Sequence, residues 1–323
     1  MSNLFRILVF VILELVVYLL FINKLRKRKI GQSIRKEGPS KHEIKRGTPT
    51  MGGLVFSIFI IIGYITGLLL FDISVFNYQT IVIIISILGY GILGFIDDYL
   101  IVVRHNNDGI KANIKFIIQM FLAAIIFFIL LKNNHSTILN VFGYKIDLIF
   151  IYGIFIILFF TSTTNALNLT DGLDGLASGI TLTILIGLLI YSYYVSNTNI
   201  IILVLCSIIS IIGFMFYNIH PAKIFMGNTG SLVLGALISI IFIILKIEML
   251  LIIMGSILVI ETLSDILQVT YFKITKGKRI FKMAPLHHHF ELCGYSEWQI
   301  DLMFWMFNLV MSLIGVIIGV RIF

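Results

Sequence analysis

Long apolar runs separated by short polar intervals occupy almost the whole chain. The first, from Leu4 to Ile22, is long enough as a helix to cross roughly 30 Å of hydrocarbon. It lacks a small-residue cleavage site, so we expect an anchor and not a signal peptide. Further runs lie near residues 51–71, 79–96, 114–131, 148–165, 175–195, 199–217, 230–247, 249–271 and 301–320. The pattern predicts an all-α, polytopic membrane protein, a bundle of about ten transmembrane helices.

The polar intervals between these runs are too short to form a second domain. The longest, about residues 24–50, is basic and has no apolar core of its own. We therefore expect residues 1–323 to form a single integral-membrane domain. One interval, Ile138 to Leu148, alternates polar and apolar residues around Phe142-Gly143, which predicts a small β-hairpin.

The composition supports the membrane assignment, because 59% of the residues are hydrophobic and only 12% are charged. Soluble domains are about half apolar and about a quarter charged. The chain has two cysteines, Cys206 within a predicted span and Cys293 in a polar interval. We expect both to be reduced, with neither a disulfide nor a cysteine metal site.

Basic residues predict the orientation, because loops rich in Lys and Arg stay in the cytoplasm. We therefore expect the N-terminus outside, and the loops near 98–113, 166–174, 218–229 and 272–300 inside. The net charge of +8 follows from this topology and favours anionic membrane lipid over nucleic acid as a partner. The interval after the first span carries Lys24, Arg26, Lys27, Arg28, Lys29, Arg35, Lys36, Lys41, Lys45 and Arg46.

Five polar motifs fall at the inner ends of predicted spans, so they can meet at one depth. This predicts an active-site cleft on the cytoplasmic side of the bundle. The motifs are KRGTPTMGG at 45–53, Asp97-Asp98, NALNLTDGLDG at 165–175, HPAKIFMGNTGS at 220–231 and APLHHHFE at 284–291.

Two pairs of carboxylates stand out within these motifs. Asp97 and Asp98 lie at the membrane boundary, where buried charge is costly unless a cation compensates it. Such a pair suits Mg²⁺, which takes one or two carboxylates together with substrate phosphates, although a solvated helix end is the alternative. Asp171 and Asp174 are three residues apart, and at the start of a helix they would share one face. Capping of the following helix is their structural alternative.

The remaining motifs offer an aromatic ring, open backbone amides and imidazoles. A base or sugar could stack on Phe225, although core packing is equally compatible with it. Asn228 can offer an amide oxygen to a metal, without negative charge. The histidines at 287–289 can bind phosphate, ligate metal or shuttle protons, and the nearby carboxylates favour Mg²⁺ over a transition metal. Glu261 and Asp265 lie within the ninth span and indicate either function or pairing inside the bundle, whereas Glu14 is assigned a structural role.

At these residues the chain resembles the MraY family of phospho-N-acetylmuramoyl-pentapeptide transferases, in the polyprenyl-phosphate N-acetylhexosamine-1-phosphate transferase superfamily. The motifs TPTMGG, FIDDY, NALNLTDGLDGL, PAKIFMG and APLHHHFE recur in order across nearly the whole chain. The resemblance implies a ten-helix bundle with both ends outside, a broken ninth helix and a cytoplasmic cleft. It also implies a bacterial plasma (inner) membrane enzyme that joins the phospho-sugar of UDP-MurNAc-pentapeptide to undecaprenyl phosphate, with Mg²⁺, to give lipid I and UMP.

The resemblance also implies the roles of individual residues. Asp97 would be the base or the phosphate-orienting acid with Asp98 beside it, and both, with position 228, would hold Mg²⁺. Asp171 and His287 would complete the catalytic set. A homodimer is left open. The implied substrate-binding residues are Lys45, Thr50, Lys115, Asn168, Asp174, Asn218, Phe225, Gln268 and His288.

Two positions depart from the family pattern. Asn228 stands where the family carries an Asp that ligates Mg²⁺, and Ile101, four residues after Asp97, stands where it usually carries a lysine. Losing one carboxylate and one lysine leaves the net charge of the site unchanged, which favours a compensated exchange. The competing hypothesis is a weakened or inactive homologue that still binds lipid or nucleotide.

Two other functions compete with this interpretation. Another polyprenyl-phosphate HexNAc-1-phosphate transferase would usually carry a differently ordered histidine motif, so PLHHHFE favours the muramoyl enzyme. A secondary transporter would place its ionisable residues near the middle of the bilayer, whereas here most lie at one surface.

Overall fold

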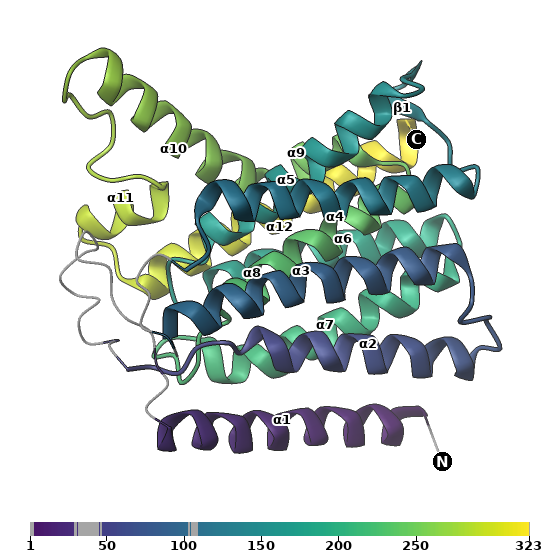
Figure 1. The fold of residues 1–323 in the computed structure, drawn as a ribbon, viewed down its shortest axis with the longest axis horizontal. Helices are drawn as coiled ribbons and strands as arrows, with labels where there is room; N and C mark the ends of the chain where they lie inside the picture. The colour runs from purple at the N-terminus through teal and green to yellow at the C-terminus, as the bar shows by residue number, and fades with distance from the viewer. Residues whose placement is uncertain are drawn as a thin grey trace.

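The chain forms a bundle of long helices in this computed structural model, which describes residues 3–28, 31, 45, 47–102, 104 and 109–322 (Figure 1). The elements are α1 (Asn3–Lys27), α2 (Gly53–Leu70), α3 (Tyr78–Val102), α4 (Ala112–Lys132), β1 (Ile138–Val141), β2 (Tyr144–Asp147), α5 (Ile151–Thr170), α6 (Leu176–Tyr194), α7 (Thr198–Asn218), α8 (Gly227–Ile244), the 3₁₀ turn η2 (Glu248–Leu250), α9 (Leu251–Met254), α10 (Ser256–Ile274), α11 (Leu286–Leu292) and α12 (Glu297–Ile322).

Nine of the described helices are long and apolar enough to cross a membrane, and the bent pair of Glu248–Met254 and Ser256–Ile274 makes ten if counted as one span. The predicted multi-pass membrane protein of about ten helices is therefore confirmed. Some helices extend past the apolar runs. Thus α1 continues through Lys24 and Lys27, because cations are favourable at the C-terminal end of a helix and their long side chains can reach water.

Helix α8 lies at the centre of the bundle and packs against α3, α5 and α2. It is apolar on all sides, and from Thr229 to Ile244 every residue is buried. Glycines allow its first turn to lie close to its neighbours: a Cβ added at Gly53 would overlap Gly230, and one added at Gly94 would overlap Asn228. These contacts bring the TPTMGG, FIDDY and MGNTG motifs together.

The predicted β-hairpin is also confirmed. Strands β1 and β2 are antiparallel, with Ile138 opposite Asp147 and Val141 opposite Tyr144. Phe142 and Gly143 form the turn with φ of 49° and 99°, as a tight hairpin turn with two positive φ angles requires.

The implied break in the ninth span is present between α9 and α10, whose axes differ by 82°. A break frees backbone groups that are costly to leave unpaired inside a membrane. The Asn308 side chain of α12 pairs two of them, donating to the Met254 carbonyl at 3.1 Å and accepting from the Ile257 amide at 3.1 Å. Beyond the break, α10 leaves the bundle and leads into the segment that carries α11 (Figure 1).

Candidate active site

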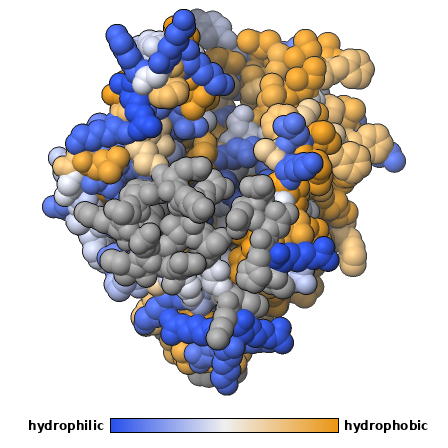
Figure 2. Space-filling model, turned by 60° about the vertical axis from the view of Figure 1, so that its left-hand side comes forward, coloured by the Kyte–Doolittle hydropathy of each residue, from blue (hydrophilic) through white to orange (hydrophobic). Residues whose placement is uncertain are grey.

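The five polar motifs lie at one end of the bundle, which we call the polar end, where α2, α4, α6, α8 and α12 begin (Figure 1). Figure 2 turns this end forward and shows hydrophilic residues on the face and hydrophobic residues along its upper right flank. Backbone hydrogen bonds join the TPTMGG and PAKIFMG motifs, from Phe225 N to Pro49 O at 2.8 Å and from Gly52 N to Phe225 O at 2.9 Å. These two motifs meet, as their positions at the inner ends of the predicted spans allowed.

Asp97 is buried at the end of α3 and is paired with a lysine of α4. Lys115 Nζ lies 2.8 Å from Asp97 Oδ2, and the Ile110 amide donates to Asp97 Oδ1 at 2.7 Å. The same ammonium lies 3.1 Å from Asn228 Oδ1. Lys115 therefore neutralises Asp97 and links α4 to the first turn of α8.

Asp98 is also buried, and it caps the N-terminus of α8 from the neighbouring helix. Its Oδ1 accepts from the backbone and side-chain nitrogens of Asn228 at 2.9 and 3.1 Å, and its Oδ2 accepts from the backbone nitrogen and hydroxyl of Thr229 at 2.9 and 2.6 Å. A carboxylate at a helix N-terminus satisfies backbone donors that have no partner within the helix. Four donors occupy the acceptor positions of Asp98.

Asp171 has a different environment. It ends α5, and no described residue donates a hydrogen bond to its carboxylate. Burial, with smaller contributions from the Asp98 and Asp174 carboxylates, raises its pKa to about 8, while Lys45 acts in the opposite direction. Because the chain leaves the helix after Thr170, Asp171 and Asp174 lie in a turn, so the one-face argument from helical spacing does not apply to them.

His287 is fully buried and held by Glu261 of α10. Glu261 Oε2 lies 2.8 Å from His287 Nδ1, and Glu261 Oε1 accepts from the His287 amide at 3.1 Å. His287 Nε2 has no hydrogen-bond partner among the described residues and faces the backbone of Gly172, where a Cβ would overlap it. The pair therefore leaves Nε2 buried and without a hydrogen-bond partner among the described residues, next to the turn that begins with Asp171. The intramembrane acid Glu261 serves in pairing, one of the two roles that its position indicated.

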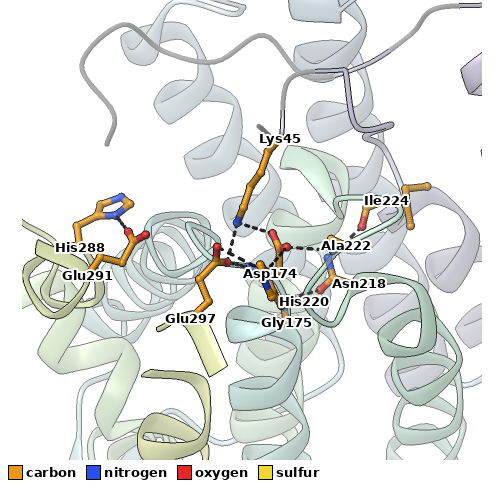
Figure 3. A network of polar contacts seen from close by, with 10 residues as sticks. All are labelled: Lys45, Asp174, Gly175, Asn218, His220, Ala222, Ile224, His288, Glu291 and Glu297. Carbon is orange, nitrogen blue, oxygen red and sulfur yellow. Dashed lines mark hydrogen bonds and ion pairs between the residues drawn. The ribbon is translucent and has the colours of Figure 1, made fainter. Parts of the chain in front are cut away.

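A second cluster surrounds Lys45 (Figure 3). Lys45 Nζ lies 2.7 Å from Asp174 Oδ1 and 2.6 Å from Glu297 Oε2. Asp174 Oδ2 also accepts from the Ala222 amide at 3.0 Å and lies 3.1 Å from His220 Nδ1. Burial lowers the pKa of Lys45, but the Asp174 and Glu297 carboxylates outweigh that effect and raise it.

Two members of this second cluster were missed in the sequence. Glu297 and His220 had no assigned role, although Glu297 lies four residues before the last apolar run and His220 opens a recognised motif. With Asp174 they offer ligand atoms within 4.8 Å of one another, close enough to hold a metal ion. In this structure the Lys45 ammonium contacts the two acids of the trio.

Three amide side chains indicated for substrate binding connect the motifs to each other. Asn218 accepts from Gly175 N and donates to Ile224 O, at 3.1 and 3.0 Å. Gln268 accepts from the Ile280 and Phe281 amides, both at 3.0 Å. Asn168 donates to Asn228 Oδ1 at 2.6 Å and to Ser231 Oγ at 2.8 Å. These contacts fix the turns that surround the site.

The other indicated residues are placed at the same end. Thr50 is buried, with its hydroxyl 2.8 Å from where a Cβ on Gly227 would lie. Phe225 is half-buried between the TPTMGG motif and α8. His288 Nδ1 lies 2.8 Å from Glu291 Oε2, in a pair drawn apart from the Lys45 cluster in Figure 3.

Comparison with known proteins gives one consistent family. The profile of glycosyl transferase family 4 matches residues 80–246, and signature 1 of the phospho-N-acetylmuramoyl-pentapeptide-transferases matches residues 45–56. The protein of that name from Staphylococcus epidermidis is 46% identical over 311 residues, 94% of each chain. The protein from Staphylococcus carnosus is 43% identical over 319 residues, which cover 96% of this chain and 97% of the relative. The protein from Staphylococcus aureus is 46% identical over 307 residues, which cover 93% of this chain and 94% of the relative.

These matches extend over nearly the full length of the chain and include the motifs that meet at the polar end. The chain therefore belongs to the phospho-N-acetylmuramoyl-pentapeptide-transferase family, a family of membrane-embedded transferases.

Proposed function

We propose that this transferase moves phospho-MurNAc-pentapeptide from UDP-MurNAc-pentapeptide to undecaprenyl phosphate, giving lipid I and UMP in peptidoglycan precursor synthesis. The observation that carries the proposal is the convergence of the family's motifs at one end of the bundle. There the cations of Lys45 and Lys115 lie among the buried acids Asp97, Asp98 and Asp174. Phosphoryl transfer depends mainly on positioning and on neutralising phosphate charge, which this arrangement suits.

We place the polar end on the cytoplasmic side of the bacterial plasma membrane. Lys24, Lys27 and Arg28 are exposed at the end of α1. Lys273 lies in the last turn of α10, and further basic residues follow up to Lys282. The opposite end has few cations, and one of them, Lys246, is paired with Glu248 at 3.0 Å. Loops rich in Lys and Arg remain in the cytoplasm, which supports this orientation.

In the proposed reaction an oxygen of the lipid phosphate attacks the phosphorus that carries the sugar. A new P–O bond forms to the lipid phosphate, and the bond from that phosphorus to the bridging oxygen breaks, so that UMP leaves with this oxygen. Lys115 and Lys45 would offset phosphate charge, and Asp97 would orient the lipid phosphate and accept its proton. His287 Nε2, which has no partner among the described residues, would bind a phosphate oxygen.

Mg²⁺ is the cofactor that the family resemblance implies for this site. The hard oxygen donors at the polar end suit this ion. Asp98 is not suited to bind the ion, because four protein donors already occupy the acceptor positions of its carboxylate. The Asp171 carboxylate, in contrast, accepts no hydrogen bond from the described residues. We therefore propose Asp171 as the protein ligand. When bound with the substrate, Mg²⁺ would neutralise charge on the pyrophosphate.

The nucleotide sugar that the protein uses as donor distinguishes the proposed reaction from that of another HexNAc-1-phosphate transferase. Purified protein in nanodiscs with undecaprenyl phosphate is offered UDP-MurNAc-pentapeptide or UDP-GlcNAc, and the lipid product is identified by mass spectrometry. We expect lipid I and no GlcNAc-pyrophosphoryl lipid. A product formed only from UDP-GlcNAc would replace the proposal with the alternative.

A further inference from the structure

The Asn228 side chain contacts Asp98 of α3 and two hydrogen-bond donors from other helices. Its Oδ1 accepts from Lys115 Nζ at 3.1 Å and from Asn168 Nδ2 at 2.6 Å, and its Nδ2 donates to Asp98 Oδ1 at 3.1 Å. The orientation of the amide follows from its neighbours: a lysine ammonium can only donate, and a carboxylate can only accept. All the polar atoms of the Asn228 side chain are therefore engaged by protein groups.

Asp98 has no free acceptor position on the side that faces Asn228. Each of its oxygens accepts two hydrogen bonds, which accounts for the roughly four lone-pair positions of a carboxylate. The side chain is 3% exposed, so water does not compete for these positions. A metal ion could bind Asp98 here only by displacing a donor from the first turn of α8.

The identity of residue 228 decides whether a cation can bind between this residue and Asp98. An aspartate there would bring a carboxylate oxygen to within about hydrogen-bond distance of Asp98 Oδ1, where the Asn228 nitrogen now lies at 3.1 Å. Two carboxylates so close cannot both stay ionised without a cation or a shared proton between them. The amide nitrogen removes that need, because it replaces the repulsion with a hydrogen bond.

Lys115 supplies the positive charge next to this bond. Its ammonium lies between Asp97 Oδ2 at 2.8 Å and Asn228 Oδ1 at 3.1 Å, and the side chain is 16% exposed. Ile101 brings no second cation: a Cβ on Gly109 would lie 2.5 Å from Asp97 Oδ1 and 3.0 Å from Ile101 Cγ1, so this apolar side chain lies near the carboxylate. Within the described part of the chain, Lys115 is the cation paired with Asp97.

We propose that the Asn228 amide and the Lys115 ammonium together fill the cation position beside Asp97 and Asp98, so that this chain holds no resident divalent cation there. The consequence of this inference for the reaction rests on the proposed function. A divalent cation at this place would have to be held by the pyrophosphate of the donor substrate, because the protein alone offers too little negative charge for it there. Asn228 and Lys115 thereby make cation binding dependent on substrate.

Binding of Mn²⁺, measured by electron paramagnetic resonance on metal-free protein in nanodiscs without substrate, tests the proposal. Asn228→Asp should bind Mn²⁺ at least about tenfold more tightly than the parent, because it adds a carboxylate facing Asp98. Adding Asp98→Asn to that variant should abolish the gain. Asn228→Ala should bind no more weakly than the parent.

A second variant keeps the test valid if Asn228→Asp does not fold. Lys115→Met removes the internal cation and leaves Asp97 Oδ2 facing Asn228 Oδ1, so its Mn²⁺ affinity should also rise by about tenfold, and Asp97→Asn in that background should abolish the rise. Parent-like Mn²⁺ binding in the folded variants, or a parent site lost in Asn228→Ala, would overturn the proposal. Neither result depends on transferase activity, so failure of the proposed function would be seen separately, as absence of lipid I.

Discussion

Glu261, in the part of the broken span that leaves the bundle, accepts both hydrogen-bond donors that His287 directs toward it. The carboxylate lies 2.8 Å from Nδ1 and 3.1 Å from the backbone nitrogen, and both residues are fully buried. A carboxylate that accepts Nδ1–H fixes the orientation of the imidazole and leaves Nε2 directed at the turn that begins with Asp171. Helix α10, which follows the bend at Gly255, is thereby linked to the site through the contact between Glu261 and His287.

We therefore predict that Glu261→Gln lowers turnover by about a hundredfold, because a glutamine offers one acceptor where two are needed and the imidazole turns. The rate of UMP release is measured together with the thermal unfolding midpoint. Thr262→Val is the matched control, since the Thr262 hydroxyl bonds only within its own helix, to Leu258 O, among the described residues. Unchanged turnover in a folded Glu261→Gln protein would mean that His287 does not act in the reaction.

Asp97→Asn should lower turnover by about a hundredfold or more, as loss of a positioned acid–base group typically does. The variant keeps a side chain of the same size beside Lys115, so folding should be retained. Asp147→Asn serves as the control, because Asp147 lies in the hairpin at the opposite end. A turnover within about threefold of the parent would remove Asp97 from the chemistry.

The raised pKa of Asp171 predicts that the stability of the metal-free protein depends on pH. Its pKa is raised from 3.8 to about 8 in the folded chain, chiefly by burial. Between pH 3.8 and about pH 8, the folded state therefore keeps a proton on Asp171 that the unfolded state has lost. The free energy of unfolding should consequently fall as pH rises from about 4 toward 8. Asp171→Asn should flatten this decline. Equal pH curves for the parent and for Asp171→Asn would contradict the assignment of the raised pKa to Asp171.

Much of the architecture could be predicted because membrane spans are visible as apolar runs. Backbone groups must be paired within the bilayer, so a long apolar run has few alternatives to a helix. The five motifs could likewise be assigned to one end from the direction in which each helix crosses. The hairpin followed from the alternation around Phe142-Gly143.

The pairing of side chains at the polar end could not be predicted in the same way. Asp171 and Asp174 are three residues apart, yet one lacks a donor and the other contacts Lys45, because the chain turns between α5 and α6 with Gly175 at a φ of 84°. Glu297 joins Asp174 across 123 positions of sequence. Such contacts depend on how helices pack, and no local spacing encodes them.

The orientation of the bundle can be tested by cysteine labelling in intact cells. In a background with Cys206→Ser and Cys293→Ser, we expect Lys27→Cys and Lys278→Cys to resist an impermeant thiol reagent because both sites face the cytoplasm. Lys145→Cys in the exposed strand β2 should react, which shows that the reagent reaches the outer surface. Labelling at either of the first two sites would reverse the topology and place the polar end outside.

The most direct test of the account is UMP release by the purified protein in nanodiscs with UDP-MurNAc-pentapeptide and Mg²⁺. We predict release that requires undecaprenyl phosphate and that falls by about a hundredfold or more in Asp97→Asn. Release that continues without the lipid phosphate, or no release from a folded protein with both substrates and Mg²⁺ present, would contradict the conclusion that the polar end carries out this transfer.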